Sequence, residues 1–412
     1  MAERATIIGA GIVGICTAIS LLEKGFDVLL IDRNEPAEGA SHGNAGVVSP
    51  WTCVPQSMPG VWRSIPKWLF DPEGPIALKW SYLPKFIPWA IKFLEAGKEE
   101  GLPAIADAMQ ALNRPNVDLY RQLLEGTGSE HLIVESMYVH VSRNEDAVDL
   151  NSLAWKLREE RGVPIEVVGP ERLREVEPDL SPAYKTGVLM KGQARAIDPG
   201  GVGKALAEKA KRMGADFLKA GVHRIEQSPT GEWNIHTDTG ERKAINLIIA
   251  AGAWSARLLE PLGYDLPLEA ERGYHLIFQN PGITVNNSIM DADAKFVASS
   301  MAAGVRCAGT AEFAGLDALP DYRRAQVFAR LAKHLFPDIN TKDTIEWMGS
   351  RPSFPDSLPC LGEIPSKKGL FCAFGHSHYG FGMAPNTGRV VASIVTGEPV
   401  NIDLTPYQIS RF

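Results

Sequence analysis

Cysteine is scarce in this sequence, and the few cysteines present form no pattern. Five of them are scattered over 412 residues, none in a C-x-x-C pair. An odd, scattered set fits neither a disulfide framework nor a zinc site, and it suits a reducing compartment. We therefore interpret all five as thiols.

Neither an excess of basic charge nor a long apolar run is present. Lys and Arg total 42 against 49 Asp and Glu, so the formal net charge is −7. Such a chain has no overall field to attract nucleic acid, and we expect no DNA or RNA partner. No apolar stretch is long enough to span a bilayer, and the N-terminus lacks the features of a secretory signal. We expect a cytoplasmic protein, with any membrane contact peripheral on the inner face of the cytoplasmic membrane.

The first 32 residues do contain a nucleotide-binding pattern. A short β-branched run precedes Gly9, Gly11 and Gly14, which form G-x-G-x-x-G, and apolar residues then recur at helical spacing up to Gly25. A second apolar run ends in Asp32. The pattern predicts a strand, a tight turn, a helix and a second strand that ends in an acidic side chain.

Each part of this pattern has a physical reason. The first glycine permits the tight turn, the second lets a pyrophosphate approach the backbone, and the third lets the helix pack on the strand. The helix N-terminus stabilises the phosphates, and the acidic side chain can bind both ribose hydroxyls. The motif therefore predicts a bound dinucleotide, and by itself it leaves NAD and FAD both open.

Nucleotide-type elements occupy both ends and the middle of the chain, and two insertions near 61–145 and 256–343 build something else. Helical patterns cover 103–125, 151–161 and about 321–335, whereas 223–241 alternates in period two as an antiparallel meander should. A ligand between the two interleaved parts would be enclosed.

A second glycine-rich stretch, GHSHYGFGMAPNTGR, covers 375–389. Its two histidines, His376 and His378, could share a metal ion, but imidazoles at i and i+2 lack a third ligand. The many glycines, which have no side chain, favour instead a large flat ligand that the backbone approaches closely. We therefore expect no metal.

Residues 51–95 hold five of the nine tryptophans, among many prolines and lysines. Tryptophan and lysine together suit a membrane surface, whereas aromatic loops also form the wall or lid of a ligand pocket. The sequence leaves both functions open.

Five motifs together resemble the D-amino-acid oxidase superfamily of FAD enzymes: IIGAGIVG…LLID, SHGNAG, IIAAGAW, GSRPSFPDSLPCLG and GHSHYGFGMAPNTGR. The similarity runs over nearly the whole chain, and the best match is to the bacterial D-amino-acid dehydrogenase group. It implies an α/β fold in which a Rossmann-like FAD-binding domain of the glutathione-reductase type is interleaved with a mixed-sheet α+β substrate domain. The implied ranges are 1–60, 146–176, 197–255 and 344–412 for the FAD-binding domain and 61–145, 177–196 and 256–343 for the substrate-binding domain.

The resemblance also implies the FAD contacts. Asp32 would bind the adenosine ribose, Val222 would face the adenine, and backbone N–H groups around Gly382 would meet the pyrimidine edge of the flavin. His42 stands near the position where some relatives attach FAD covalently, with loop packing as the alternative. The implied FAD-binding residues are Gly9, Gly11, Ile12, Val13, Gly14, Asp32, Arg33, Ser41, His42, Asn44, Ala45, Gly46, Val222, Ala251, Gly252, Trp254, Arg351, Gly380, Phe381, Gly382 and Met383.

Three further residues are implied to act on the substrate. Arg351 would clamp the substrate carboxylate, because a guanidinium offers a planar bidentate fork; the alternative is a salt bridge at the domain seam. Tyr274 and His275, in ERGYHLIF, sit where family members line the substrate pocket, and each could equally be an ordinary half-buried strand residue.

The implied activity is FAD-dependent oxidative deamination of a small amino acid, either a D-amino acid or one of the D-proline or hydroxyproline type. A hydride would pass from Cα to flavin N5 and give an imine. One alternative is oxidation of a 2-hydroxy acid, for which a positioned histidine would be expected among His42, His275, His376 and His378. Another is a non-catalytic flavoprotein subunit of an electron-transfer complex. The sequence leaves open the stereochemistry, the oligomeric state and the electron acceptor, which is a quinone of the respiratory chain or oxygen.

Overall fold

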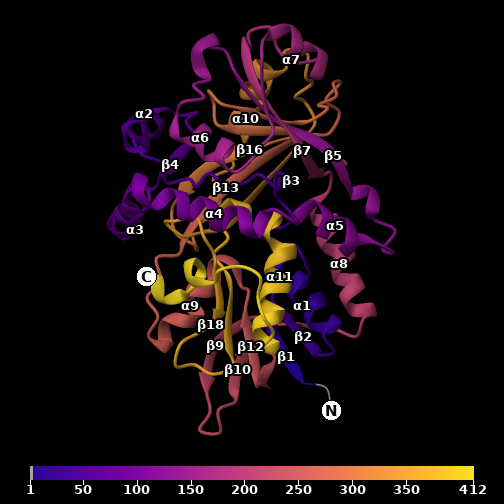
Figure 1. The fold of residues 1–412 in the computed structure, drawn as a ribbon, viewed down its shortest axis with the longest axis vertical. Helices are drawn as coiled ribbons and strands as arrows, with labels where there is room; N and C mark the ends of the chain where they lie inside the picture. The colour runs from indigo at the N-terminus through magenta and orange to yellow at the C-terminus, as the bar shows by residue number, and fades with distance from the viewer. Residues whose placement is uncertain (1–2) are drawn as a thin grey trace.

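The computed structural model describes residues 3–412, and two β-sheets organise it (Figure 1). A six-stranded sheet lies in the lower half of the view and a ten-stranded sheet in the upper half. The chain passes between them several times, so each half is built from segments far apart in the sequence. The α/β fold of two interleaved parts expected from the sequence is confirmed.

The six-stranded sheet has the strand order β18-β19-β12-β1-β2-β8. All neighbours are parallel except the edge strand β18, which runs antiparallel to β19. Its inner strands β1, β2, β12 and β19 are buried apolar runs, as parallel sheets covered on both faces require. The strands are β1 (Arg4–Ile8), β2 (Asp27–Asp32), β8 (Asp216–Lys219), β12 (Asn246–Ile249), β18 (Cys360–Glu363) and β19 (Leu370–Phe374).

The predicted strand, turn, helix and strand at the N-terminus is present. Helix α1 (Ile12–Glu23) follows β1 directly and ends at Gly25, whose φ of 82° is left-handed. The antiparallel meander is also confirmed, as the three-stranded sheet of β9 (Val222–Gln227), β10 (Trp233–Thr237) and β11 (Gly240–Ala244). Helix α8 (Pro199–Arg212) packs on α1.

The ten-stranded sheet has the order β17-β13-β16-β15-β14-β5-β7-β3, with two further strands at its sides. Its face away from the nucleotide sheet packs on α10 (Arg323–Leu335) through apolar side chains of alternate residues. The main-path strands are β3 (Val47–Val48), β5 (Ile133–Ser142), β7 (Thr186–Ala196), β13 (Glu269–Phe278), β14 (Ser288–Asp291), β15 (Phe296–Met301), β16 (Gly304–Phe313) and β17 (Thr344–Ser353); the side strands are β4 (Ile76–Leu78) and β6 (Ile165–Val168).

The first insertion is mostly helical. The single helical pattern at 103–125 forms two helices, α4 (Leu102–Asn113) and α5 (Asn116–Leu124), because Pro115 cannot donate the hydrogen bond that would continue the first. The other helices of residues 61–176 are α2 (Ile65–Phe70), α3 (Leu83–Ala96), α6 (Leu153–Glu160) and α7 (Pro170–Val176). None of the helices within residues 3–412 combines the length and the apolar composition that crossing a bilayer requires.

Three strands differ from the predicted domain ranges. β3 lies in 1–60, β6 in 146–176 and β17 in 344–412, all assigned from the resemblance to the FAD-binding domain, yet each hydrogen-bonds to the large sheet. We therefore propose that 47–48, 165–168 and 344–353 belong with the substrate-binding part. The five cysteines are buried free thiols, as interpreted from the sequence.

Helix α11 (Gly380–Thr396) lies beside α1 in the nucleotide half (Figure 1). A Cβ placed on Gly388 would lie 2.6 Å from the carbonyl carbon of Cys16, so the two backbones touch there without side chains between them. Backbone cannot move aside as a flexible side chain can. The two helices are thus fixed relative to each other at Gly388.

We expect the Gly388→Ala variant to be less stable by about 1–3 kcal/mol, because the added methyl group overpacks the contact. A lower Tm in differential scanning fluorimetry would measure this. Gly101→Ala is the matched control, since a Cβ there meets no atom within 4 Å among the described residues. Equal Tm values for the two variants would contradict the close helix contact.

Candidate active site

A cavity of about 1270 Å³ runs between the two sheets, from the glycine turn after β1 to the start of α11. This volume exceeds the roughly 300–1000 Å³ of ordinary small-molecule pockets, so it has room for a long cofactor and a small substrate together. Most of the predicted FAD-binding residues border it: Gly9, Gly11, Ile12, Val13, Asp32, Arg33, Ser41, Asn44, Ala45, Val222, Ala251, Gly252, Trp254, Arg351, Gly380, Phe381 and Gly382.

The turn between β1 and α1 is tight, and its backbone packs directly against the first turn of the helix. A Cβ on Gly14 would lie 2.0 Å from the carbonyl oxygen of Gly9, so the helix can approach the strand only because Gly14 has none. Asp32 accepts hydrogen bonds from the N–H of Ala10 at 2.7 Å and of Asn34 at 2.9 Å. Each of its oxygens keeps a second lone pair that can accept a ribose hydroxyl. This end fits a dinucleotide.

The SHGNAG segment is tied to the same turn. Ser41 Oγ accepts a hydrogen bond from the N–H of Ile12 at 2.9 Å. Asn44 Oδ1 accepts one from the N–H of Gly46 at 2.8 Å, and the carbonyl of Asn44 accepts from the buried Arg306. These bonds hold the segment along the cavity wall, where the resemblance expects the flavin side of the pyrophosphate.

The start of α11 lies at the other end of the cavity. The first N–H groups of a helix have no partner within it, and they favour negative charge. Just before this helix, Ser377 has a left-handed φ of 51°. Its buried hydroxyl has no hydrogen-bond partner in residues 3–412 and borders the cavity. Orphaned donors and a strained backbone at one point fit the polar edge of a flavin.

Four predicted FAD-binding residues lie behind the wall. Gly14 packs on Gly9, and Gly46 has the Ala196 carbonyl 2.4 Å from the position of a Cβ. His42 lies against Gly200, whose Cβ would be 2.5 Å from the ring, which is the loop-packing alternative. Met383 is buried in the apolar core of the nucleotide half.

Tyr274 and His275 are both buried and engaged elsewhere. The Tyr274 hydroxyl donates to Glu312 at 2.7 Å, within the core under α10, although the residue borders the cavity. His275 stacks on Trp347 with ring centroids 5.1 Å apart and is not among the cavity-lining residues. Burial lowers the pKa of His275 to about 3, so its ring is neutral. Tyr274 thus borders the cavity with its hydroxyl already bonded to Glu312, whereas His275 packs behind the wall.

Arg351 borders the cavity within a charged cluster that the sequence did not indicate. The register of β13 and β17 places it directly opposite Glu271, and Arg351 Nη1 donates to Glu271 Oε1 at 2.7 Å. Arg351 also donates to the carbonyls of Thr310 and Gly309, at 2.8 and 3.3 Å. The guanidinium lies flat across Gly273, where a Cβ would come within 2.1 Å of Nη2.

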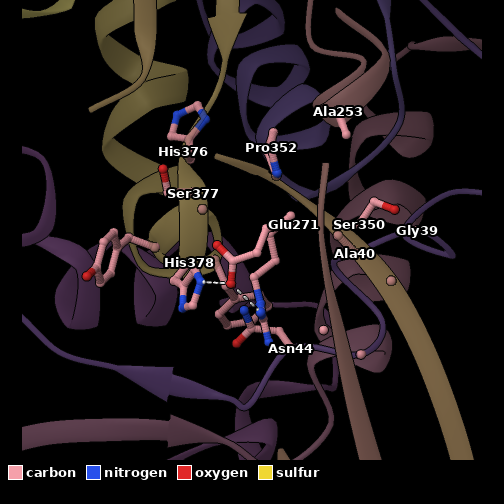
Figure 2. A pocket seen from close by; sticks show the side chains of 18 of the residues that line it. Gly39, Ala40, Asn44, Ala253, Glu271, Ser350, Pro352, His376, Ser377 and His378 are labelled. Atoms are coloured by element: carbon pink, nitrogen blue, oxygen red, sulfur yellow. Dashed lines mark hydrogen bonds and ion pairs between the residues drawn. The ribbon is translucent and has the colours of Figure 1, made fainter. Parts of the chain in front are cut away.

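His378 completes the cluster. Its Nε2 lies 2.5 Å from Glu271 Oε1, and Figure 2 shows the ring and the carboxylate facing each other. Ser353 Oγ donates to the other carboxylate oxygen at 2.9 Å. Burial would raise the pKa of Glu271, but its contacts with His378, Arg351 and Ser353 outweigh burial and lower the pKa to about 2. Glu271 is therefore ionised.

His376 and His378 point to different partners. His376 Nε2 lies 3.1 Å from Thr387 Oγ1, and burial lowers the pKa of His376 to about 3. Within residues 3–412, no cluster of three or more His, Cys, Asp or Glu side chains is placed to hold a metal ion. Glu271 was not predicted from the sequence, although Glu269, Glu271 and Arg272 together in one short strand were a visible signal.

The glycine turn generates a test of the cofactor. We expect Gly11→Val to fold normally, because an added Cβ meets Ser41 Oγ at 3.5 Å, an ordinary contact distance. The larger side chain would occupy the space of the pyrophosphate, so the purified protein should lose its yellow flavin spectrum. FAD content and circular dichroism measure the two effects.

Gly169→Val is the matched control, because Gly169 faces open space outside the cavity and has an ordinary φ of −89°. It should retain full flavin. A Gly11→Val protein that binds FAD as well as the control would contradict this assignment of the turn.

Comparison of the sequence with known proteins identifies one family and full-length relatives within it. The family model for FAD dependent oxidoreductases, named DAO, matches residues 4–394. A D-amino-acid oxidase of Bradyrhizobium diazoefficiens is 39% identical over 417 residues, covering 100% of this chain and 99% of that protein. A D-amino acid dehydrogenase of Rhizobium rhizogenes is 28% identical over 415 residues, covering 99% and 100%.

Two solved structures share the fold at low identity. Glycine oxidase from Geobacillus kaustophilus has a TM-score of 0.75 at 22% identity, covering 100% of both chains. L-proline dehydrogenase from P. horikoshii has a TM-score of 0.76 at 19% identity, covering 100% of this chain and 98% of that one. At these identities the likeness concerns the fold alone.

Proposed function

The chain belongs to the DAO family of FAD-dependent oxidoreductases, and from that premise we propose that it oxidises a small free D-amino acid bound between Arg351 and Glu271. FAD, held by the glycine turn, the SHGNAG segment and the start of α11, supplies the acceptor for two electrons. The residues of this chain bind the amino acid, orient its Cα–H bond and keep water out. The product is the imine, which water hydrolyses.

One observation carries the substrate class: a cation and an anion lie side by side on the cavity face of two paired strands. A free amino acid carries the complementary pair of charges on a single carbon. Its carboxylate can bind the guanidinium of Arg351, whose Nη2 has a long contact of 3.3 Å to Gly309, and its ammonium can approach Glu271.

The same pair of charges weighs against the 2-hydroxy-acid alternative. A hydroxy acid brings a carboxylate for Arg351 but no cation to set against Glu271, so a buried negative charge would face a neutral hydroxyl. The D configuration rests on the names of two full-length relatives, a D-amino-acid oxidase and a D-amino acid dehydrogenase.

Arg351 provides a direct test. We expect Arg351→Met to raise the Kd of the amino acid about 10- to 100-fold, because a hydrogen bond to a charged group contributes about 1.5–3 kcal/mol. Arg351→Lys keeps the charge that Glu271 needs but loses the fork, so its Kd should fall between those of wild type and Arg351→Met. Anaerobic mixing with D- and L-amino acids, sarcosine and 2-hydroxy acids, followed by flavin bleaching, gives these constants. Bleaching by hydroxy acids alone would overturn the proposal.

The tryptophan-rich segment has two sides. Toward the interior, Trp89 borders the cavity, stacks on Phe86 and donates to the carbonyl of Ser353 at 3.0 Å. Its outer side exposes large apolar side chains on α2, α3 and their connections, at the left margin of Figure 1. The exposed fractions are Trp62 56%, Phe70 77%, Trp80 63%, Ile87 45% and Ile91 54%; we call these five residues the outer apolar surface.

We propose that the outer apolar surface rests on an anionic membrane. Singly exposed apolar side chains are ordinary, but five within one 30-residue segment are typical of an interaction site. Residues 61–95 carry five basic side chains against three acidic ones, which suits anionic lipid head groups. A membrane quinone would then be an electron acceptor within reach of the cavity wall.

Vesicle sedimentation tests the membrane proposal. Wild type should pellet with vesicles containing phosphatidylglycerol more than with phosphatidylcholine alone, and the combined Trp62→Ser, Phe70→Ser, Trp80→Ser, Ile91→Ser variant should stay in the supernatant. Leu319→Ser with Ile345→Ser is the control, because these residues are 88% and 44% exposed and lie elsewhere in the sequence. Wild type that does not pellet with either lipid would refute the proposal.

A further inference from the structure

His378 borders the same cavity as Arg351 and has no part in holding the substrate carboxylate. Its polar contacts are both at one ring nitrogen: Nε2 lies 2.5 Å from Glu271 Oε1 and 2.6 Å from the amide of Gln56. The other nitrogen, Nδ1, has no hydrogen-bond partner in residues 3–412. The side chain is 32% exposed, so this free nitrogen is accessible.

The tautomer of His378 follows from its partner. Glu271 is an ionised carboxylate that already accepts from Arg351 and Ser353, so it has no proton to donate. The atom that faces it must therefore carry the hydrogen, so Nε2 is the N–H of the ring, and the amide of Gln56, 2.6 Å from the same atom, turns its oxygen rather than its nitrogen toward it. Nδ1 is then left with the lone pair of a neutral imidazole. A carboxylate that fixes a histidine tautomer in this way prepares the opposite nitrogen as a base.

The reaction of the proposed function needs such a base. An amino acid is an ammonium ion near neutral pH, and its Cα cannot give up a hydride while the nitrogen lone pair is bound to a proton. We propose that Nδ1 of His378 accepts this proton and that Glu271 is the positioning residue that holds the ring. This inference rests on the proposed function and deepens it.

The atoms and charges of this step balance. One N–H bond of the ammonium breaks and leaves its electron pair on the nitrogen, while a new N–H bond forms at Nδ1. His378 becomes an imidazolium beside the Glu271 carboxylate, and the substrate becomes a neutral amine with its carboxylate still on Arg351. The positive charge thus moves from one neighbour of Glu271 to another.

The surroundings of His378 suit a base that is neutral at rest. Burial lowers its pKa, Glu271 on β13 raises it, and Arg351 on β17 lowers it further. Gln56 from the 51–60 segment adds no charge, and the neighbouring Tyr379 ring lies 6.2 Å away with its hydroxyl donating to the Val54 carbonyl. His378 is therefore unprotonated at neutral pH and gains its best counter-ion when it takes a proton.

The pH dependence of flavin reduction tests the assignment. In wild type, the rate of bleaching by a D-amino acid should be flat near neutral pH and fall on the acid side as His378 becomes protonated. In His378→Gln, it should drop about 100-fold at pH 7 and rise tenfold per pH unit toward the pKa of the free amine, because then only the minor neutral amine reacts. Glu271→Gln should move the acid limb to lower pH, since the charge that raises the pKa of His378 is removed.

A binding measurement separates the base from the clamp. Propionate carries a carboxylate and no ammonium, so calorimetry with propionate reports on Arg351 without any oxidation. Glu271→Gln should bind propionate more tightly, because Arg351 is no longer paired, while His378→Gln should bind it as wild type does. A merely structural role for His378 would weaken propionate binding as well.

His236→Gln is the matched control variant. His236 also lies beside a glutamate, with Nε2 2.9 Å from Glu226 Oε1, but on the exposed three-stranded sheet outside the cavity. Its pH profile should match wild type. A His378→Gln profile of unchanged shape, reduced by a constant factor, would overturn the base assignment alone. Failure of every amino acid to bleach wild type would instead overturn the proposed function, and this inference with it.

Discussion

The ion pair between the buried Glu271 and the partly buried Arg351 is the interaction on which the site depends. The two residues are direct neighbours across β13 and β17, so the pair exists only in one register of these strands. A slip of β17 by one residue would turn Arg351 to the opposite face, under α10, and leave Glu271 without its partner. Removing one member of a buried pair costs about 3–5 kcal/mol, because the other charge is left unpaired. The strand register, the ion pair and the cavity wall therefore depend on one another, so loss of one disrupts the other two.

Residues without side chains make room for this pair. Gly273 lies two positions after Glu271 on the same face, and Arg351 can extend across the sheet only because Gly273 has no Cβ. In the nucleotide half, Gly14 and Gly388 have the same effect, since α1 approaches β1 through one and α11 approaches α1 through the other. The start of α11 is thereby held at a fixed height above the sheet that carries Arg351. Close backbone contacts thus set the depth of the cavity between cofactor and substrate.

Local patterns in the sequence predicted the nucleotide half well, and long-range pairing explains what they missed. The turn, helix α1 and the closing acid lie within 32 residues, so their spacing carries the geometry. Glu271, Arg351 and His378 come from three elements and span 107 residues, and their meeting depends on a sheet register that no local pattern encodes. Tyr274 and His275 are adjacent on β13, so their side chains face opposite sides of the sheet, and the local sequence does not distinguish which of the two faces a ligand. The prediction of one continuous helix over 103–125 was wrong for a reason that is visible in the sequence, because Pro115 lies within this range and interrupts the helix.

The position of Glu271 also limits how tightly this site can bind. The guanidinium of Arg351 is shared between Glu271 and two carbonyls, so an incoming carboxylate must compete with bonds already made. A carboxylate without an ammonium takes Arg351 away from Glu271 and leaves Glu271 without a cation, so it gains little binding energy. An amino acid also takes Arg351, but its own ammonium then lies beside Glu271. The site therefore binds ligands that carry only the carboxylate weakly, and it binds ligands that carry both the carboxylate and the ammonium more tightly. Weak ground-state binding of this kind leaves more of the interaction for the transition state, where the ammonium proton has moved and the imidazolium faces Glu271.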